Sequence, residues 1–233
     1  MWKRIKLIKS RGELLESVLI VGFALLCNSI AYYGARLIAS SWYHHDMTTQ
    51  VDEMIPYMPW TVSIYWGCYL FWGINYCLCA LQDRAARNRF FCADILSRCV
   101  CLAFFLLLPT TNIRPEVADG GVWNFLMRLL YSVDSADNLF PSIHCLVSWL
   151  CWIGVRNRKD VSVVYRYFSL FAAVVICIST LTTKQHVIVD VIGGVVLAEV
   201  CYLVAGIPAI HAFFSKIMAK LFGLLRFKRK TKS

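Results

Sequence analysis

The sequence predicts an all-α integral membrane protein with six transmembrane helices. Hydrophobic residues make up 59% of its 233 residues and charged residues 16%, whereas soluble domains are nearer half apolar and a quarter charged. The apolar residues are gathered in six long stretches. The basic residues lie in alternate connections between those stretches, as expected when basic loops stay on the cytoplasmic side of a membrane.

Each of the six stretches is a candidate to cross the bilayer, because about 20 apolar residues span the hydrocarbon core. They run over approximately residues 14–38, 58–81, 91–109, 142–156, 162–183 and 187–209. The 142–156 stretch is short, so we expect it to begin or end in the polar interface. The first stretch follows basic residues, as a signal peptide does, but it exceeds the usual apolar core of about 7–15 residues. We therefore expect a transmembrane helix there.

The positions of Lys and Arg predict the orientation of the chain. Eighteen of the 24 basic residues fall in residues 1–12, 82–89, 156–159 and 216–232. The intervening connections, which hold few basic residues, are 39–57, 110–141 and 184–186. We therefore expect both termini in the cytoplasm and these three connections on the opposite side. The net charge of +10 then indicates attraction to an anionic membrane surface, and we expect no nucleic-acid partner.

Two shorter helices are expected at the membrane surface. Val122–Tyr131, within the 110–141 connection, is too short to cross and too apolar to lie in water. From His211 onward, apolar residues recur at helical spacing with Lys and Arg between them, which predicts an amphipathic, basic C-terminal helix. No repeat or linker divides the chain, so residues 1–233 are expected to form a single membrane domain.

The cysteines and the loop histidines do not require a metal. All 11 cysteines lie in or at the edge of apolar stretches, and their spacings lack the two-residue gap of zinc ligands. The sequence His44-His45-Asp46 could bind a metal, but a solvated loop is the simpler interpretation. We expect no metal and no cofactor.

Chemically capable side chains gather at the span ends of one membrane face: Arg114 after the third span, Ser142 and His144 at the start of the fourth, and Lys184, His186 and Asp190 at the start of the sixth. An arginine and two histidines suit phosphate transfer, because they supply a fixed cation, a nucleophile and a proton donor. Residues four apart share a helix face, so Asp190 can fix the ring tautomer of His186. A purely structural His–Asp pair is the alternative.

These residues resemble the three signature motifs of the type 2 phosphatidic acid phosphatase superfamily, over about residues 90–205. The similar segments are Arg114-Pro115, Pro141-Ser142-Ile143-His144, and Ser179 with His186 and Asp190. The resemblance implies a six-helix core and a phosphohistidine mechanism. In it, His186 would be the nucleophile, Asp190 would orient it, and His144 would protonate the leaving group and then activate the acceptor. Arg114 and Ser142 would bind phosphate oxygens.

Three positions depart from the family pattern. Leu107 replaces the lysine of the first motif, Thr180 the arginine of the third, and Ile143 the glycine of the second. Lys184 is a candidate to restore one of the two missing cations. A site with few cations suits a singly charged phosphodiester better than a doubly charged monoester. That favours the branch resembling inositol-phosphorylceramide and sphingomyelin synthases.

The sequence therefore predicts a lipid phosphatase whose active site faces away from the cytoplasm and whose partners are the bilayer and a lipid phosphate or phospholipid. The alternative is a phosphotransferase that moves a phosphorylated headgroup from a phospholipid to a lipid alcohol. A non-catalytic lipid transporter or scaffold, which Glu199 in the sixth span would serve, is a second alternative. We expect instead that Glu199 makes a structural hydrogen bond and that Asp94 pairs with Arg98.

Overall fold

The structure of the chain, a computed structural model, describes residues 10–230, with side chains up to residue 223. The basic residues expected before the first span, Lys3, Arg4, Lys6 and Lys9, lie outside the described residues. The helices are α1 (Arg11–Ser29), α2 (Ala35–Ala39), α3 (Gln50–Met54), α4 (Val62–Ala80), α5 (Arg84–Leu107), α6 (Val122–Val133), α7 (Ile143–Arg156), α8 (Val163–Thr182), α9 (Ile188–Val204) and α10 (Pro208–Lys230). A π-helical turn, η1 (Ile30–Gly34), joins α1 to α2, and a 3-10 turn, η2 (Pro59–Thr61), precedes α4.

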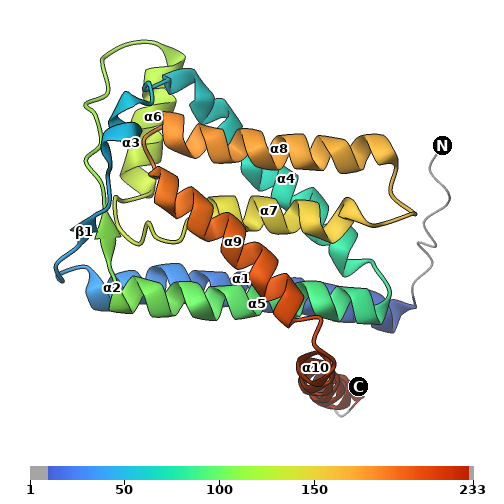
Figure 1. Ribbon diagram of the computed structural model, residues 1–233. Helices are drawn as coiled ribbons and strands as arrows, with labels where there is room; N and C mark the ends of the chain where they lie inside the picture. The colour runs from blue at the N-terminus through green and yellow to red at the C-terminus, as the bar shows by residue number, and fades with distance from the viewer. Residues whose placement is uncertain (1–9, 231–233) are drawn as a thin grey trace.

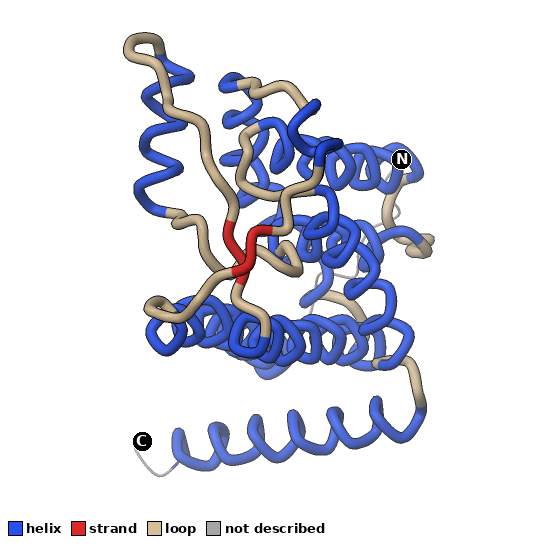
Figure 2. Tube along the Cα trace, turned by 60° about the vertical axis from the view of Figure 1, so that its left-hand side comes forward, coloured by secondary structure: helices blue, strands red, loops and turns tan. Residues whose placement is uncertain are grey.

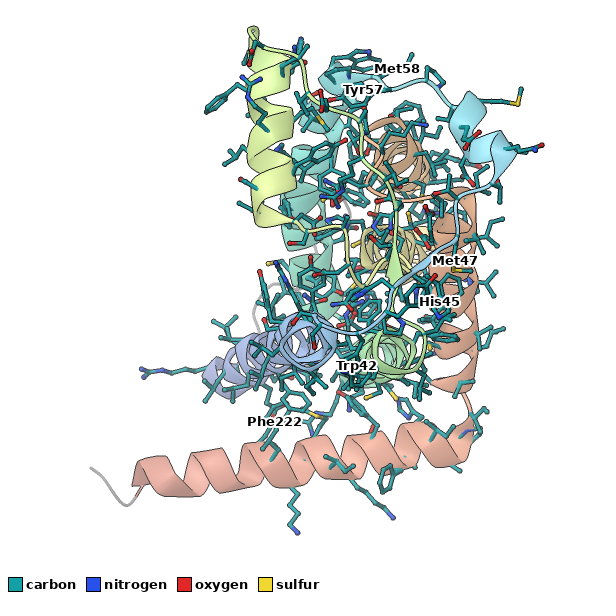
Figure 3. All side chains as sticks on the ribbon, turned by 90° about the vertical axis from the view of Figure 1, so that its left-hand side faces the viewer. Trp42, His45, Met47, Tyr57, Met58 and Phe222 are labelled. Carbon is teal, nitrogen blue, oxygen red and sulfur yellow. The ribbon has the colours of Figure 1, made fainter. Side chains whose placement is uncertain are left out.

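The long helices form a bundle around α7, which packs against α4, α5, α8 and α9 (Figure 1). The starts of α7 and α9 lie at one end of this bundle, which we call the histidine end. The start of α5 lies at the other end, near α10. Figure 3, which looks nearly along α5, shows α10 running across the bundle axis. The bend between α9 and α10 is 85°.

The chain is a membrane protein, and a helix occupies every stretch in which a span is predicted. Three helical segments are long and apolar enough to cross a membrane, namely Arg11–Ala39, Arg84–Leu107 and Val163–Thr182. The bent pair of α9 and α10 makes a fourth if it counts as one span, and α7 is a shorter apolar helix. The all-α membrane class is therefore confirmed, while the number of six crossings stays a prediction.

Helix boundaries follow from caps that the apolar pattern does not reveal. α5 begins seven residues before the predicted 91 because the Asp83 side chain accepts a hydrogen bond from the N–H of Ala86. α9 ends at Val204, before the predicted 209, and Pro208 starts a new helix, a position that proline favours. The earlier start of α5 places Arg84, Arg87, Asn88 and Arg89 in the helix at the α10 end.

The outer connections are more ordered than predicted. Two short strands, β1 (His45–Asp46) and β2 (Thr110–Thr111), pair in parallel and tie the segment after α2 to the segment after α5 (Figure 2). The predicted surface helix is present as α6. Its Met127 and Leu130 are buried against Val62 and Tyr65 of α4, so α6 covers the histidine end of that helix.

The predicted amphipathic helix is present as α10. Phe214, Met218 and Phe222, four residues apart, are buried against the bundle. Phe213 and Ile217 on the same helix are exposed, at 67% and 45%. Phe213 and Ile217 are four residues apart and lie together on one side of the buried stripe. An exposed apolar strip beside the bundle contact suits the boundary between headgroups and acyl chains.

Two polar pairs inside the bundle agree with the sequence predictions. Arg98 donates to Asp94 at 2.7 Å, and both residues are buried. Glu199 accepts hydrogen bonds from Trp149 at 3.0 Å and from Arg156 at 2.6 and 3.0 Å. The ion pair gives Glu199 a structural partner, as expected for a carboxylate within an apolar helix.

Gly194 brings α9 against the start of α7. A Cβ atom at this position would lie 2.5 Å from the carbonyl oxygen of Ser142 and 3.1 Å from the backbone nitrogen of Leu146. The N–H of Ser142 donates to the carbonyl of Asp190 at 3.0 Å across the same crossing. This close approach sets the separation between the start of α7 and the start of α9, beside which the two histidines lie.

We expect Gly194→Ala to destabilise the protein by about 1–3 kcal/mol, the usual cost of overpacking, because the clashing atoms belong to the backbone of α7. Turnover should fall as well. The measurement is thermal unfolding of purified protein in detergent. Gly22→Ala is the matched control, since a Cβ at Gly22 in α1 meets nothing within 4 Å. Equal melting temperatures for Gly194→Ala and wild type would contradict the close crossing.

Candidate active site

The two predicted histidines are neighbours at the histidine end, with their rings tilted by 52°. His144 is in the first turn of α7, and His186 lies in the short connection before α9. Their ring centroids are 6.0 Å apart. Both line a cavity of 230 Å³, which we call the inner cavity, together with Asp134, Gln185 and aromatic side chains of η1 and α4. The topology therefore brings together two imidazoles that are 42 positions apart in the sequence.

Asp190 holds the ring of His186. Nδ1 of His186 lies 3.3 Å from Oδ2 of Asp190. The same carboxylate oxygen accepts a hydrogen bond from the N–H of Val187 at 3.1 Å, and Asp190 is fully buried. With Nδ1–H donated to a carboxylate, the hydrogen-bond network assigns the lone pair of His186 to Nε2. The predicted contact between His186 and Asp190 is present, and it leaves the second ring nitrogen of His186 outside this hydrogen bond.

His144 has its own carboxylate, which the sequence did not reveal. The hydroxyl of Tyr65 in α4 donates to Oδ2 of Asp134 at 2.7 Å. The same hydroxyl oxygen lies 3.2 Å from Nδ1 of His144, so it accepts the Nδ1–H. Nε2 of His144 has no hydrogen-bond partner among the described residues. The relay Asp134–Tyr65–His144 thus fixes the tautomer and leaves Nε2 able to give or take a proton.

Asp134 is held by a second tyrosine. The hydroxyl of Tyr32, in the π-helical turn η1, donates to Oδ1 of Asp134 at 2.5 Å. Burial raises the pKa of Asp134, but the nearby His144, the two tyrosine hydroxyls and His186 outweigh burial and lower it. The carboxylate is therefore charged at neutral pH. Its partners are 69 and 102 positions away in the sequence, so no local motif points to Asp134.

We expect Tyr65→Phe to lower kcat by about 10-fold to 100-fold, part of what general acid–base catalysis contributes, while KM stays nearly constant. The change removes only the hydroxyl that joins Asp134 to His144. Steady-state kinetics in detergent measure it. Tyr33→Phe, which removes a hydroxyl from another tyrosine lining the inner cavity, is the control. A wild-type kcat in Tyr65→Phe would exclude the relay.

A second cavity, of 510 Å³, lies on the other side of His186. We call it the outer cavity. It is lined by His186, by the predicted cations Arg114 and Lys184, and by Asp46 and Asp52 of the β1–α3 segment. The Lys184 ammonium donates to the backbone carbonyl of Asp52 at 2.8 Å. The structure therefore places Lys184 beside His186, but on the side away from His144.

Arg114 links the two cavities. Its guanidinium donates to the backbone carbonyl of Asp134 and to the side-chain oxygen of Gln185. It also lies over the ring of Tyr131, 4.8 Å from the centroid. Gln185 lines the inner cavity and Arg114 the outer one. Gln185 directly precedes His186 in the chain, so its hydrogen bond with Arg114 places this planar cation close to His186.

Ser142 is placed differently from the other predicted residues. It is fully buried and precedes α7, where its hydroxyl accepts a hydrogen bond from the N–H of Cys145 at 3.3 Å. It lines neither the inner nor the outer cavity. Capping uses a lone pair of the hydroxyl and leaves its proton free to donate. Phosphate binding by Ser142 stays a prediction.

The arrangement of these residues agrees with a comparison to known families. A family model described as the PAP2 superfamily matches residues 41–204, more than two thirds of the chain. The chain belongs to the PAP2 superfamily. The match contains every predicted site residue and also Asp134 and Tyr65. Neither a curated protein nor a solved structure matches the chain.

Members of the PAP2 superfamily are generally phosphatases or phosphotransferases, which confirms the broad class of activity. The structure also explains two departures from the PAP2 superfamily pattern. Leu107 is 85% exposed at the end of α5 and lines neither the inner nor the outer cavity. Thr180 is fully buried, and its carbonyl accepts hydrogen bonds from the N–H groups of Gln185 and His186 at 3.0 and 3.1 Å. The backbone at Thr180 therefore holds the backbone of His186, while its side chain supplies no cation.

The pKa of His186 predicts how activity depends on pH in this member of the PAP2 superfamily. Burial lowers that pKa, but the hydrogen bond and charge of Asp190, with Cys145 and Asp134, outweigh burial and raise it above the ordinary histidine value. Attack on phosphorus needs the unprotonated ring. We therefore expect kcat/KM to fall as the pH drops through this raised pKa.

Asp190→Asn should shift that acidic limb to lower pH, because it removes the main group that raises the pKa of His186, and should also lower the maximum rate. The pH profile of kcat/KM for both proteins is the measurement. Asp160→Asn, which alters an exposed ion pair with Arg158, should leave the profile unchanged. A limb at the same pH in Asp190→Asn would show that Asp190 does not set the protonation of His186.

Proposed function

We propose that the chain is a membrane-embedded lipid phosphatase that hydrolyses a lipid phosphate ester through a phosphohistidine at His186. The observation that carries this proposal is the pair of neighbouring imidazoles, each held at Nδ1. Asp190 holds His186 directly, and Asp134 holds His144 through the hydroxyl of Tyr65. Two ring nitrogens, both Nε2, are thereby left for the reaction. One acts as nucleophile and the other as acid and base.

In the first step, Nε2 of His186 attacks phosphorus, a P–N bond forms, and the P–O bond to the lipid breaks. The protonated His144 gives its Nε2 proton to the departing oxygen, so the lipid leaves as an alcohol. In the second step, water attacks phosphorus while the now neutral His144 removes a proton from it. The P–N bond breaks, phosphate leaves, and both histidines return to their starting states. Arg114, held beside the site, offsets negative charge on the phosphate oxygens.

A lipid substrate is supported by the shape of the site. The inner cavity shares Asn28, Tyr69 and Trp72 with an apolar groove of 320 Å³ between α1 and α4. Val21, Ala24 and Leu25 of α1 line that groove. An acyl or prenyl chain in the groove would place its headgroup beside His144 and His186. We propose that the histidine end faces away from the cytoplasm, because the basic segments 82–89 and 156–159 lie at the opposite end.

One observation favours headgroup transfer as a second candidate function. The inner cavity is lined by the carboxylates Asp134 and Asp137 and, among the described residues, by no Lys or Arg. The predicted cations Arg114 and Lys184 line the outer cavity instead, together with three carboxylates. Two carboxylates repel a doubly charged phosphomonoester more strongly than a singly charged phosphodiester. A phosphodiester donor with a lipid alcohol as acceptor fits that balance of charges. His144 would then deprotonate the alcohol in place of water.

The experiment that separates these functions uses purified protein in detergent without divalent metal. Phosphatidic acid, a polyprenyl phosphate and phosphodiester lipids are each supplied alone and with ceramide or diacylglycerol. Release of inorganic phosphate from a monoester supports the phosphatase. A new lipid that carries the headgroup, formed only with the alcohol, supports the transferase. No turnover under any condition would overturn both and favour a lipid transporter or scaffold.

A further inference from the structure

A third cavity lies at the α10 end of the bundle and shares no lining residue with the inner or outer cavity. It measures 560 Å³ and is enclosed by the beginnings of α1 and α5 and by one face of α10. We propose that this cavity, the α10 cavity, binds the phosphate-bearing headgroup of an anionic phospholipid. The proposal does not depend on the reaction at His186.

Charge is the first argument. Arg84, Arg87 and Lys216 line the cavity, and within its described lining Glu16 is the one carboxylate. Glu16 accepts hydrogen bonds from Arg84 at 3.0 and 2.9 Å and from Arg87 at 3.1 Å. The carboxylate therefore holds the two guanidinium groups in place, but it offsets only one of the three positive charges. The N-terminus of α5, where Arg84 and Arg87 lie, adds to the positive potential.

Unsatisfied polar groups are the second argument. Arg87 and Asn88 also line the cavity, and each is only 2% exposed. Nε of Arg87 and Oδ1 of Asn88 have no hydrogen-bond partner among the described residues, although Nδ2 of Asn88 donates to Ser215 at 3.0 Å. Buried donors and acceptors are normally paired. A phosphate oxygen can accept from Arg87, and a headgroup hydroxyl can donate to Asn88, so a hydroxylated headgroup such as glycerol fits both.

The surroundings favour a lipid over a free phosphate ion. Met218 and Phe222 of α10 form an apolar wall of the cavity. On one adjacent face of the same helix, Phe213 and Ile217 are exposed. Because α10 runs across the bundle axis (Figure 3), these apolar side chains lie where an interfacial helix meets acyl chains. Figure 3 labels Phe222 on the side of α10 that faces the bundle, next to this space.

The test is lipid binding by full-length protein in dodecyl maltoside, titrated with dioleoyl phosphatidylglycerol and followed by native mass spectrometry. Lys216→Gln should weaken binding of one phosphatidylglycerol by about five-fold, from roughly 1 kcal/mol per basic residue near an anionic lipid. Arg84→Gln, at a mostly exposed side chain, should have a similar effect. Lys220→Gln is the matched control, because Lys220 is exposed on α10 but does not line the cavity.

Two further arms identify the ligand. Dioleoyl phosphatidylcholine should bind more weakly than phosphatidylglycerol, and glycerol 3-phosphate without acyl chains should not compete. Equal binding of phosphatidylglycerol to wild type, Lys216→Gln and Arg84→Gln would overturn the proposal, as would an equal loss in Lys220→Gln. Full competition by glycerol 3-phosphate would assign the cavity to a soluble anion instead. Turnover at His186 should be unchanged in all three variants, so failure here is distinct from failure of the proposed reaction.

Discussion

His186→Ala should reduce turnover by roughly 10⁴-fold or more, the scale seen when a covalent nucleophile is removed. The reason is that His144, the other imidazole that lines the inner cavity, reaches its carboxylate only through Tyr65, whereas Nδ1 of His186 contacts Asp190 directly. The variant should also fail to become labelled when substrate carrying ³²P is mixed with protein and quenched in alkali, which preserves a phosphohistidine. Phosphate release and labelling are measured on the same samples.

The chain supplies a matched control for this experiment. His45→Ala removes an imidazole from an exposed position in β1 and should leave both turnover and labelling at wild-type levels. Thermal unfolding should show that His186→Ala is folded. Labelling of folded His186→Ala at the wild-type level would mean that the phosphate is carried elsewhere, and the proposed mechanism would be abandoned.

His144→Ala should lower turnover by about 10²-fold to 10⁴-fold, the range for loss of general acid–base catalysis. The loss should depend on the leaving group. A p-nitrophenyl phosphate ester needs little protonation as it leaves, so the first step should largely recover with it. The second step still lacks a base to activate water, so phosphorylated His186 should accumulate. Rapid-quench measurement of labelled protein follows both steps.

His44→Ala, another histidine outside the cavities, is the control for this variant. It should show no accumulation and no dependence on the leaving group. If His144→Ala loses activity equally with poor and good leaving groups and no labelled protein builds up, His144 does not act as acid and base. In that case Tyr65→Phe should also be silent, because the relay acts through His144.

The parts of the site that depend on local spacing could be predicted from the sequence. The contact between His186 and Asp190 could be predicted from their spacing of four residues, although His186 precedes α9 and meets the Asp190 carboxylate where that carboxylate reaches back over the start of the helix. Asp134 could not be found in this way, because its tyrosine partners come from η1 and α4 and meet it only after the bundle forms. The sequence also did not reveal on which side of His186 the Lys184 side chain lies. The Lys184 backbone has a positive φ of 54°, and the side chain donates to the backbone carbonyl of Asp52.

The fold shows the same division. The apolar stretches predict where the long helices lie, because apolar residues must be buried in lipid or protein. The helix boundaries depend on single residues, such as the cap Asp83 before α5 and Pro208 at the start of α10. The apolar pattern does not reveal them. The two-residue strands β1 and β2 carry no periodicity that a sequence could display. The number of crossings depends on α4, on the short helix α7 and on the bent pair of α9 and α10. None of these is among the three helical segments that are long and apolar enough to cross a membrane.

His186 lines both the inner cavity, which adjoins the apolar groove between α1 and α4, and the outer cavity. This position has a consequence for inhibition. A compound that enters through the outer cavity would meet Arg114, Lys184 and His186 without displacing an acyl chain from the groove between α1 and α4. Because Asp46, Asp52 and Glu53 line the same cavity, such an inhibitor should carry both negative and positive groups, and it can be small and water-soluble. Its potency should be insensitive to the amount of lipid substrate in the micelle, unlike that of a lipid analogue, which must compete for the inner cavity.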